Sequence, residues 1–387
     1  MKFRRFKVKK KIITPDDGYE YFFGYYDLQP YDSDMKRHLA ARSRFADRIP
    51  KIGDELEVGY IDLDSGAFVR IATTSAWNFQ QGALLQWFDN DSVIFNDFDG
   101  EKYISRVVSV DGRELRQYDR AFATVSLKSK KAISLNFARI YDFRPGYGYC
   151  NVKDPLFDVL APESDGIFLT DLESCETKLL MSYAEMKTVF EEKPFTDEKL
   201  VVNHINFDPS GEKCVFLLRN FPKSGKRWGT VLAAIDLNGK VTPLTRFEVN
   251  SHYSWKDSRN LMIYSGLPRW GIYFFDTETG ERTELNDPLC DYDDIHCNYS
   301  PDRSCFIGDG YPDKKDNRTL FYYDFSKKRS KALFSVYSLP DGGCTDIRCD
   351  LHARWSPDGS RISYDTTENV RREIAEIVLE NGDLDFE

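Results

Sequence analysis

The sequence predicts an all-β fold, a β-propeller with seven blades of four antiparallel strands each. The first indication is a unit of strand, turn and strand that recurs late in the chain, opens with histidine and carries an aromatic residue three positions later. Its four copies begin at His204, His252, His296 and His352, which are 48, 44 and 56 residues apart. Spacings of about this size are typical of propeller blades. We therefore expect one blade to start at each of these histidines.

Turn chemistry is the second indication. In the last copy, Ser356, Pro357, Asp358 and Gly359 separate two short strand candidates. Proline presets the backbone φ angle at one turn position, and glycine accepts a positive φ that other residues resist. Composition is the third indication, because 41% of the residues are hydrophobic and 14% are aromatic. That is ample for a packed core and excludes a disordered chain.

Length and charge limit the classes of protein that remain. The 387 residues are expected to form a single propeller domain, residues 1–387, because no linker or low-complexity segment divides them. The formal net charge of −10, from 63 acidic and 53 basic residues, argues against a nucleic-acid partner. No apolar run approaches the roughly 18 residues of a membrane span. The eight cysteines are scattered, which favours a reducing compartment, so we predict a cytoplasmic protein.

The first eleven residues contain seven lysines or arginines, but no apolar segment of a signal peptide follows them. Basic and apolar side chains alternate loosely over residues 1–13, as in an edge strand. We expect this segment to pair with the last blade and close the propeller. A solvated basic tail is the alternative.

The first three blades are placed by strand and turn signals alone. Blade one is expected at residues 23–27, 38–45 and 57–63, and blade two at residues 80–87, 92–95 and 104–110. Blade three is expected to hold strands at residues 132–139, 144–149 and 166–171, with a loop over residues 151–165. Residues 182–192 are the best helix candidate, because Tyr183, Met186, Val189 and Phe190 share one face.

Blades four to seven are expected to start at the four repeated histidines, with further strands such as residues 214–218 and 230–236. The total is seven blades, or six if blade three is divided wrongly. The aromatic residues three positions after the histidines should pack between blades, as large apolar side chains generally do. They are Phe207, Trp255, Tyr299 and Trp355.

The shared position of four histidines suggests a common function. The first strand of each propeller blade lines the central axis, so these side chains are expected to converge at one mouth. A structural histidine, bonded to a neighbouring strand, explains any one of them. It explains four less well, because the other blades lack histidine at that position. Histidine can act as a general base, a general acid or a metal ligand.

The histidine register, with the Ser-Pro-Asp-Gly turns and Gly308-Asp309-Gly310, resembles that of the oligogalacturonate lyases, bacterial seven-bladed propellers with TolB-type repeats. The likeness covers about residues 200–370, and the first three blades agree only in general pattern. It implies that His252 abstracts a proton, and that His296 and His352 hold a divalent metal near the substrate carboxylate.

The chain departs from the family pattern at two metal positions. Asp350 stands where the family has a further histidine, and Ile347 stands where it has glutamine. A carboxylate can still bind a metal, whereas an isoleucine side chain cannot. The implied site is therefore His296, His352 and Asp350 around manganese, calcium or zinc. Cys297 and Cys349 are alternative soft ligands that would favour zinc.

The reaction implied by the resemblance is β-elimination at the glycosidic bond of a uronic acid. It needs a neutralised carboxylate, a base for the C5 proton and help for the leaving oxygen. Beside His252, the catalytic candidates are His204, Arg219 and Tyr147. Candidates for substrate binding are Arg139, Arg144, Tyr149, Gln80 and Gln81. Residues 144–149, with two glycines beside two tyrosines, are expected to form a fixed loop with exposed rings that stack on sugars.

The sequence thus predicts a metal-assisted lyase with an acidic oligosaccharide as partner, no nucleic acid and no membrane span. One alternative is a non-catalytic propeller that binds glycans or serves in assembly. Another is an unrelated sugar-modifying enzyme that uses the same funnel. Ile347 and Asp350 weaken the lyase interpretation, but they do not weaken the interpretation as a glycan-binding protein.

Overall fold

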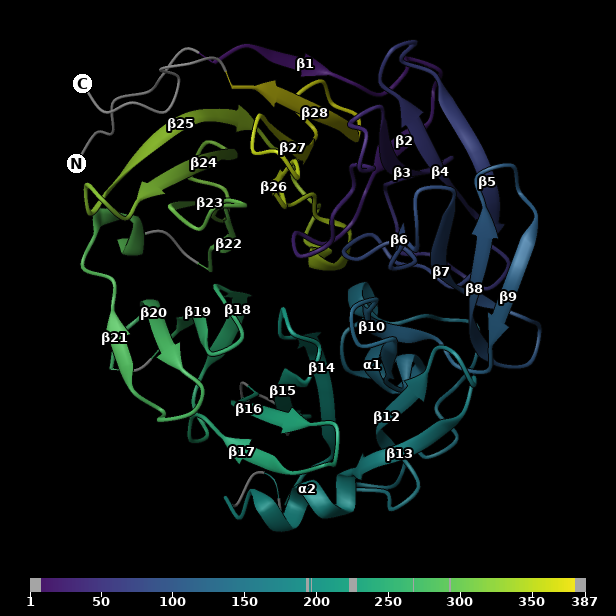
Figure 1. Ribbon diagram of the computed structural model, residues 1–387, viewed down its shortest axis with the longest axis vertical. Coiled ribbons are helices and arrows are strands. Elements are labelled where there is room, and N and C mark those ends of the chain that lie inside the picture. Colours follow the sequence, from purple (N-terminus) through teal and green to yellow (C-terminus); the bar gives the residue numbers. More distant parts are fainter. Residues whose placement is uncertain are drawn as a thin grey trace. The chain divides into compact units, whose positions relative to one another are not determined.

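Seven antiparallel sheets of four strands each make up the blades of a β-propeller (Figure 1). The computed structural model describes residues 8–192, 195, 197–222, 228–266, 268–291 and 294–379. These residues divide into two compact units. The first unit comprises residues up to 97, 106–117 and from 286 onward, and the second comprises residues 98–105 and 118–285. The predicted fold class and the blade number of seven are confirmed.

The first unit holds three whole sheets and most of a fourth. Their strands are β2 (Glu20–Phe22), β3 (Arg37–Ser43), β4 (Leu56–Asp62) and β5 (Phe68–Thr74); β22 (His296–Tyr299), β23 (Cys305–Asp309), β24 (Asn317–Asp324) and β25 (Arg329–Tyr337); β1 (Lys10–Ile12), β28 (Glu373–Val378), β27 (Arg361–Thr366) and β26 (Arg354–Trp355); and β6 (Gln86–Trp87), β7 (Ser92–Phe98), β8 (Tyr103–Ser109) and β9 (Glu114–Tyr118). Short 3-10 helices η2 (Pro288–Asp291) and η3 (Thr345–Ile347) precede β22 and β26. The turn between β7 and β8 belongs to the second unit.

The second unit holds three sheets. Their strands are β10 (Phe122–Ser126), β11 (Lys131–Ser134), β12 (Gly166–Asp171) and β13 (Thr177–Ser182); β14 (Leu200–Phe207), β15 (Lys213–Asn220), β16 (Thr230–Asp236) and β17 (Val241–Pro243); and β18 (Asn250–Trp255), β19 (Asn260–Ser265), β20 (Gly271–Asp276) and β21 (Arg282–Glu284). Helix α1 (Phe137–Phe143) and the 3-10 helix η1 (Pro145–Tyr147) follow β11, and helix α2 (Tyr183–Val189) follows β13. No helix in the described part of the chain is both long and apolar enough to cross a membrane.

The N-terminal strand β1 pairs with the C-terminal strand β28, so both ends of the described chain meet in one sheet. Lys10 lies opposite Ile377 and Ile12 opposite Ala375, and the backbone N–H of Ile13 donates to the carbonyl of Ile374. This is the pairing that we expected for residues 1–13, of which residues 1–7 lie outside the described part.

Blade three differs from its prediction. The expected strand 132–139 ends at Ser134, and residues 137–139 begin α1. Asn136 caps this helix, because its side chain accepts a hydrogen bond from the Arg139 backbone N–H. Residues 144–149 contain η1 instead of a strand. The true first strand of the blade, β10, was missed. The loop over residues 151–165 and the helix after Ser182 agree with the prediction, and Ser182 forms a capping box with Glu185.

The aromatic residues that follow the four histidines are buried, as predicted. In the second unit, Trp255 packs with Val215 and Leu217 of the preceding blade. In the first unit, the indole N–H of Trp355 donates to the carbonyl of Asn298 in the neighbouring blade, at 3.2 Å. Each of these two rings therefore packs between adjacent blades. This packing holds the segment that carries His252 or His352, three residues earlier.

His38, the fifth histidine, lies outside the repeat and is fully buried on β3. Its Nδ1–H donates to the carbonyl of Leu39 at 2.7 Å, and its ring lies edge-on to that of Tyr31. Burial, helped by the positive charge of Arg354, lowers the pKa of His38 to about 3. The folded protein therefore keeps this imidazole neutral where an unfolded chain would protonate it.

We expect the free energy of unfolding to fall as the pH drops below about 6.5. Below that pH His38 is protonated in the unfolded chain but stays neutral in the folded protein. With a folded pKa of about 3, the loss at pH 5 is ~2 kcal/mol. Denaturant titrations from pH 7 to pH 4 measure it. His38→Gln should flatten the pH dependence, whereas Leu39→Ala should destabilise the protein equally at every pH. An unchanged slope in His38→Gln would contradict this account.

Candidate functional site

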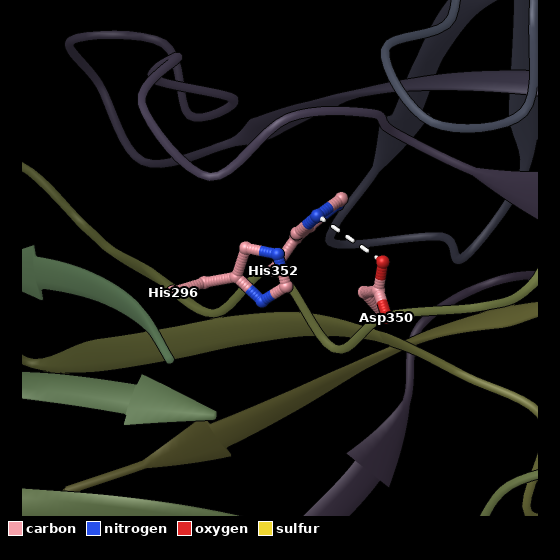
Figure 2. A group of neighbouring side chains, drawn as sticks. All are labelled: His296, Asp350 and His352. Carbon is pink, nitrogen blue, oxygen red and sulfur yellow. Dashed lines mark ion pairs between the residues drawn. The ribbon is translucent and has the colours of Figure 1, made fainter. Parts of the chain in front are cut away.

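Three potential metal ligands lie together in the first unit. His296, Asp350 and His352 each offer one ligand atom, and these atoms lie within 4.8 Å of one another. Figure 2 shows the two imidazoles side by side, with the carboxyl group of Asp350 facing His352. All three side chains are buried. His296 opens β22, and the other two residues lie in the segment that leads into β26. We refer to these residues as the His-Asp-His cluster.

A hydrogen bond orients the imidazole of His352, and a carboxylate lies next to that of His296. Nδ1 of His352 lies 2.9 Å from the carbonyl oxygen of Gly24, to which it donates, so Nε2 remains to face Asp350 at 3.8 Å. Nδ1 of His296 lies 3.4 Å from the carboxylate of Asp309. Asp309 is itself held by the backbone N–H of Leu351. Carbonyl and carboxylate partners of this kind fix the tautomer and the orientation of metal-binding histidines.

Two arginines surround the carboxylate of Asp350. Arg318 contacts it at 2.7 Å and Arg348 at 2.8 Å. Burial alone would raise the pKa of Asp350, but the two guanidinium groups hold it well below its usual range. The carboxyl group is therefore ionised. Two imidazole nitrogens and one carboxylate oxygen suit a divalent transition metal such as manganese or zinc, so the donor set fits a metal ion.

The other positions considered for metal binding contribute less. Ile347 ends η3, and its side chain packs against the apolar core of the first unit. Burial raises the pKa of the Cys349 thiol to about 12, which disfavours the thiolate that binds metals. Neither Cys349 nor Cys297 belongs to the group of neighbouring ligands found among the described residues.

The predicted catalytic residues of the second unit also lie together. The rings of His204 and His252 are 6.1 Å apart, and the Tyr147 ring meets His204 edge-on at 5.0 Å. Arg219, on β15, reaches the backbone carbonyl of Asn250 at the start of β18, at 3.5 Å. The structure thus brings His204, His252, Arg219 and Tyr147 into one region, although their catalytic roles stay predictions.

An irregular backbone places several of the repeated histidines. His204 and His352 have φ angles of +47° and +43°, in the left-handed region that non-glycine residues avoid at a cost of about 1–3 kcal/mol. The strand register shifts across His204 in β14 and across His252 in β18. Such bulges re-aim side chains and are common next to active sites. The hydroxyl of Tyr253, on β18, also donates a hydrogen bond to the carbonyl of His204, on β14.

The predicted sugar-binding stretch is buried, so the expectation of exposed rings was wrong. Tyr147 and Tyr149 are each 1% exposed. Tyr149 stacks on Phe137 at 4.4 Å because α1 folds back over it. The guanidinium of Arg144 covers the ring of Tyr147 at 4.6 Å. Roles for Tyr149 and Arg144 in substrate binding remain predictions.

Arg139 and the two glutamines have partners inside the protein. Arg139 is fully buried, pairs with Asp154 at 3.2 Å and donates to the carbonyl of Leu160, so it supports the loop over residues 151–165. Gln80 is buried and donates to the carbonyl of Arg348 at 2.9 Å. Gln81 is half-buried. Their substrate-binding roles are likewise untested predictions.

Sequence reasoning missed the residues that support the His-Asp-His cluster. Arg318 and the carbonyl of Gly24 come from segments far from it in the chain, and no motif marks them. Arg348 stands two residues before Asp350 and offered the one local signal, a cation next to a predicted ligand.

No family model matches the sequence, and no curated protein matches it. Solved structures do. The oligogalacturonate lyase of Vibrio parahaemolyticus is 13% identical with a TM-score of 0.65, covering 98% of this chain and 96% of that chain. An oligogalacturonate lyase in complex with manganese is 14% identical with a TM-score of 0.66, covering 100% and 96%. The predicted resemblance to the propellers of this family is thus confirmed for the fold.

We expect the protein, purified without chelators, to carry about one divalent metal ion per chain, because two oriented imidazoles and an ionised carboxylate form one binding site. Elemental analysis measures it. His352→Ala should lose most of the ion, whereas His38→Gln, which changes a buried histidine outside the cluster, should keep it. Negligible metal in the parent, or equal metal in His352→Ala, counts against the site.

Proposed function

We propose that this protein is a lyase that cleaves a uronate-containing oligosaccharide by metal-assisted β-elimination. The His-Asp-His cluster carries the proposal, because it occupies the metal positions that the family resemblance assigns to this chain. The propeller's likeness to an oligogalacturonate lyase solved with manganese supports it. The scattered cysteines favour a reducing, cytoplasmic setting.

The first requirement of the reaction is a neutralised substrate carboxylate. A divalent ion held by His296, His352 and Asp350 would supply positive charge there and acidify the neighbouring C5 proton. The protein's own contribution is to present these ligands already oriented. The carbonyl of Gly24 orients His352, the carboxylate of Asp309 lies 3.4 Å from His296, and the arginines keep Asp350 ionised.

Removal of the C5 proton is assigned to His252. A neutral imidazole accepts a proton readily near neutral pH, and a positioned base contributes about 10²–10⁴ in rate. The bulge at the start of β18 turns this residue out of the regular ladder. His204 and Arg219 lie in the same region of the second unit and are candidates to orient the substrate. Tyr147, against the His204 ring, is the candidate to protonate the leaving oxygen.

A non-catalytic glycan-binding protein is the second candidate function. Its specific support is that the carboxylate of Asp350 already pairs with Arg318 and Arg348. Ile347 provides no ligand atom in the position where the family has glutamine. A cluster weakened in this way would retain cationic and polar groups for an acidic sugar without the metal needed for elimination.

We expect the parent protein to convert oligogalacturonates into products with an unsaturated uronate at the new end. The new double bond absorbs in the ultraviolet, so the reaction is followed directly by absorbance. Chelation of divalent metal should stop it, and re-addition of manganese should restore it. If no member of a broad uronate panel is cleaved, but calorimetry detects binding, the second candidate function is the correct one.

His252→Ala should lower kcat by about two to four orders of magnitude, because it removes the base. Metal content and thermal stability should stay at the parental level, which distinguishes a lost base from a damaged fold. His38→Gln is the matched control and should keep kcat. Cleavage by His252→Ala at the parental rate would assign the base to another residue.

A further inference from the structure

Three phenylalanine and tryptophan side chains of the second unit are exposed to solvent. Among the phenylalanines and tryptophans that the structure describes, only Phe157, Trp228 and Trp270 are exposed, by 52%, 38% and 45%. All three belong to the second unit. Each comes from a different one of its three sheets, so the pattern repeats from blade to blade.

The three residues occupy the same connection in their blades, between the second and third strands. Phe157 lies between β11 and β12, Trp228 between β15 and β16, and Trp270 between β19 and β20. Scattered exposed apolar residues are normal on proteins. One exposed ring at the same topological position in three consecutive blades is not a scattered pattern and calls for a common cause.

These connections lie at the end of the blade where the first strand begins. In the third sheet of the unit, Asn250 at the start of β18 pairs with Ser265, the last residue before the connection that carries Trp270. In the second sheet, Leu200 at the start of β14 pairs with Asn220, just before the connection that carries Trp228. His252 and His204 follow these starting residues, so each exposed tryptophan lies toward the histidine end of its blade.

Trp270 packs against a residue of β19 that lies opposite the bulge at His252. Its indole stacks on the ring of Tyr264 at 5.4 Å, with 21° between the planes. Tyr264 lies in β19 opposite the bulge, since its neighbours Ser265 and Ile263 pair with Asn250 and Tyr253 on either side of His252. Tyr264 is buried. One face of the indole is therefore covered by Tyr264, and the exposed surface belongs to the rest of the ring.

The other two rings are also supported by the protein. Trp228 meets Phe143 edge-on at 5.4 Å, and Phe143 in turn meets Phe221 at 5.0 Å. The ammonium of Lys199 lies 3.9 Å from the centre of the Phe157 ring. Side chains held in this way lose little conformational freedom when a ligand covers them, which favours binding.

We propose that Trp228 and Trp270, with Phe157 as a third position, bind individual sugar rings of an oligosaccharide. The inference rests on the proposed function and deepens it. The substrate is an oligomer that extends beyond the two sugar residues joined by the cleaved bond. A pyranose presents a flat apolar C–H face that matches one aromatic ring. Separate rings on separate connections suit such a repeating ligand, whereas a protein partner is recognised by a contiguous patch.

Calorimetry tests the proposal in the His252→Ala background, so that the ligand is not consumed. The probes are oligogalacturonates of two to six units and neutral galacto-oligosaccharides of the same lengths. Trp228→Ala and Trp270→Ala should each weaken hexamer binding by about three- to tenfold, the effect of one lost aromatic contact. Binding of the dimer should change by less than about twofold. Trp270→Phe should retain most of the affinity, which separates a lost ring from a disturbed loop.

Leu115→Ala is the control, because Leu115 is comparably exposed but lies on β9 in the first unit. It should leave every affinity unchanged. Hexamer binding by both tryptophan variants at the level of the background protein would overturn the proposal, as would a background protein that binds neither acidic nor neutral oligomers. If the oligomers bind with the expected dependence on Trp228 and Trp270 but the parent cleaves none, the sugar positions stand and the lyase function fails.

Discussion

The buried ion pairs of Asp350 are the interaction on which the His-Asp-His cluster depends. Its carboxylate joins Arg318 of β24 to Arg348 of the segment after η3. Arg318 also donates to the carbonyl of Gly310 and the hydroxyl of Ser338. Several segments of the first unit therefore meet at one buried anion. Removing one member of such a pair leaves an uncompensated charge and costs about 3–5 kcal/mol, so the carboxylate is structurally necessary whether or not it binds a metal.

The ion pairs of Asp350 bear on both candidate functions. A carboxylate shared with two guanidinium groups offers a cation less negative charge than a lone one does. The imidazoles of His296 and His352 take no part in these ion pairs with arginine, and Nδ1 of each contacts another partner, Asp309 and Gly24 respectively. A metal ion bound at the proposed site would therefore depend mainly on the nitrogen ligands, a donor set that suits transition metals better than calcium.

The repeat was readable from the sequence because each propeller blade is one supersecondary unit, and its first strand carried a histidine and an aromatic residue in fixed register. Blade three lacked that marker. There Asn136 caps a seven-residue helix whose stability comes from packing, so its local sequence resembled a strand. The histidine register and the family resemblance also pointed to His296, Asp350 and His352, whose ligand atoms the structure brings within 4.8 Å of one another. The left-handed backbone at His204 and His352 was not readable, because residues other than glycine adopt it only where the surrounding fold enforces it.

The pairing of β1 with β28 has a consequence for how the protein is made. Thr14 and Ile374, which are hydrogen-bonded to each other, stand 360 positions apart. The second unit is nearly continuous in sequence, over residues 118–285, whereas the first unit needs residues from both sides of it. During synthesis the strands β2–β5 can pair with one another as soon as they leave the ribosome, but β1 must wait for its partner β28. The nascent chain therefore carries the unpaired edge of β1 until β28 has been made, and the last sheet closes only then.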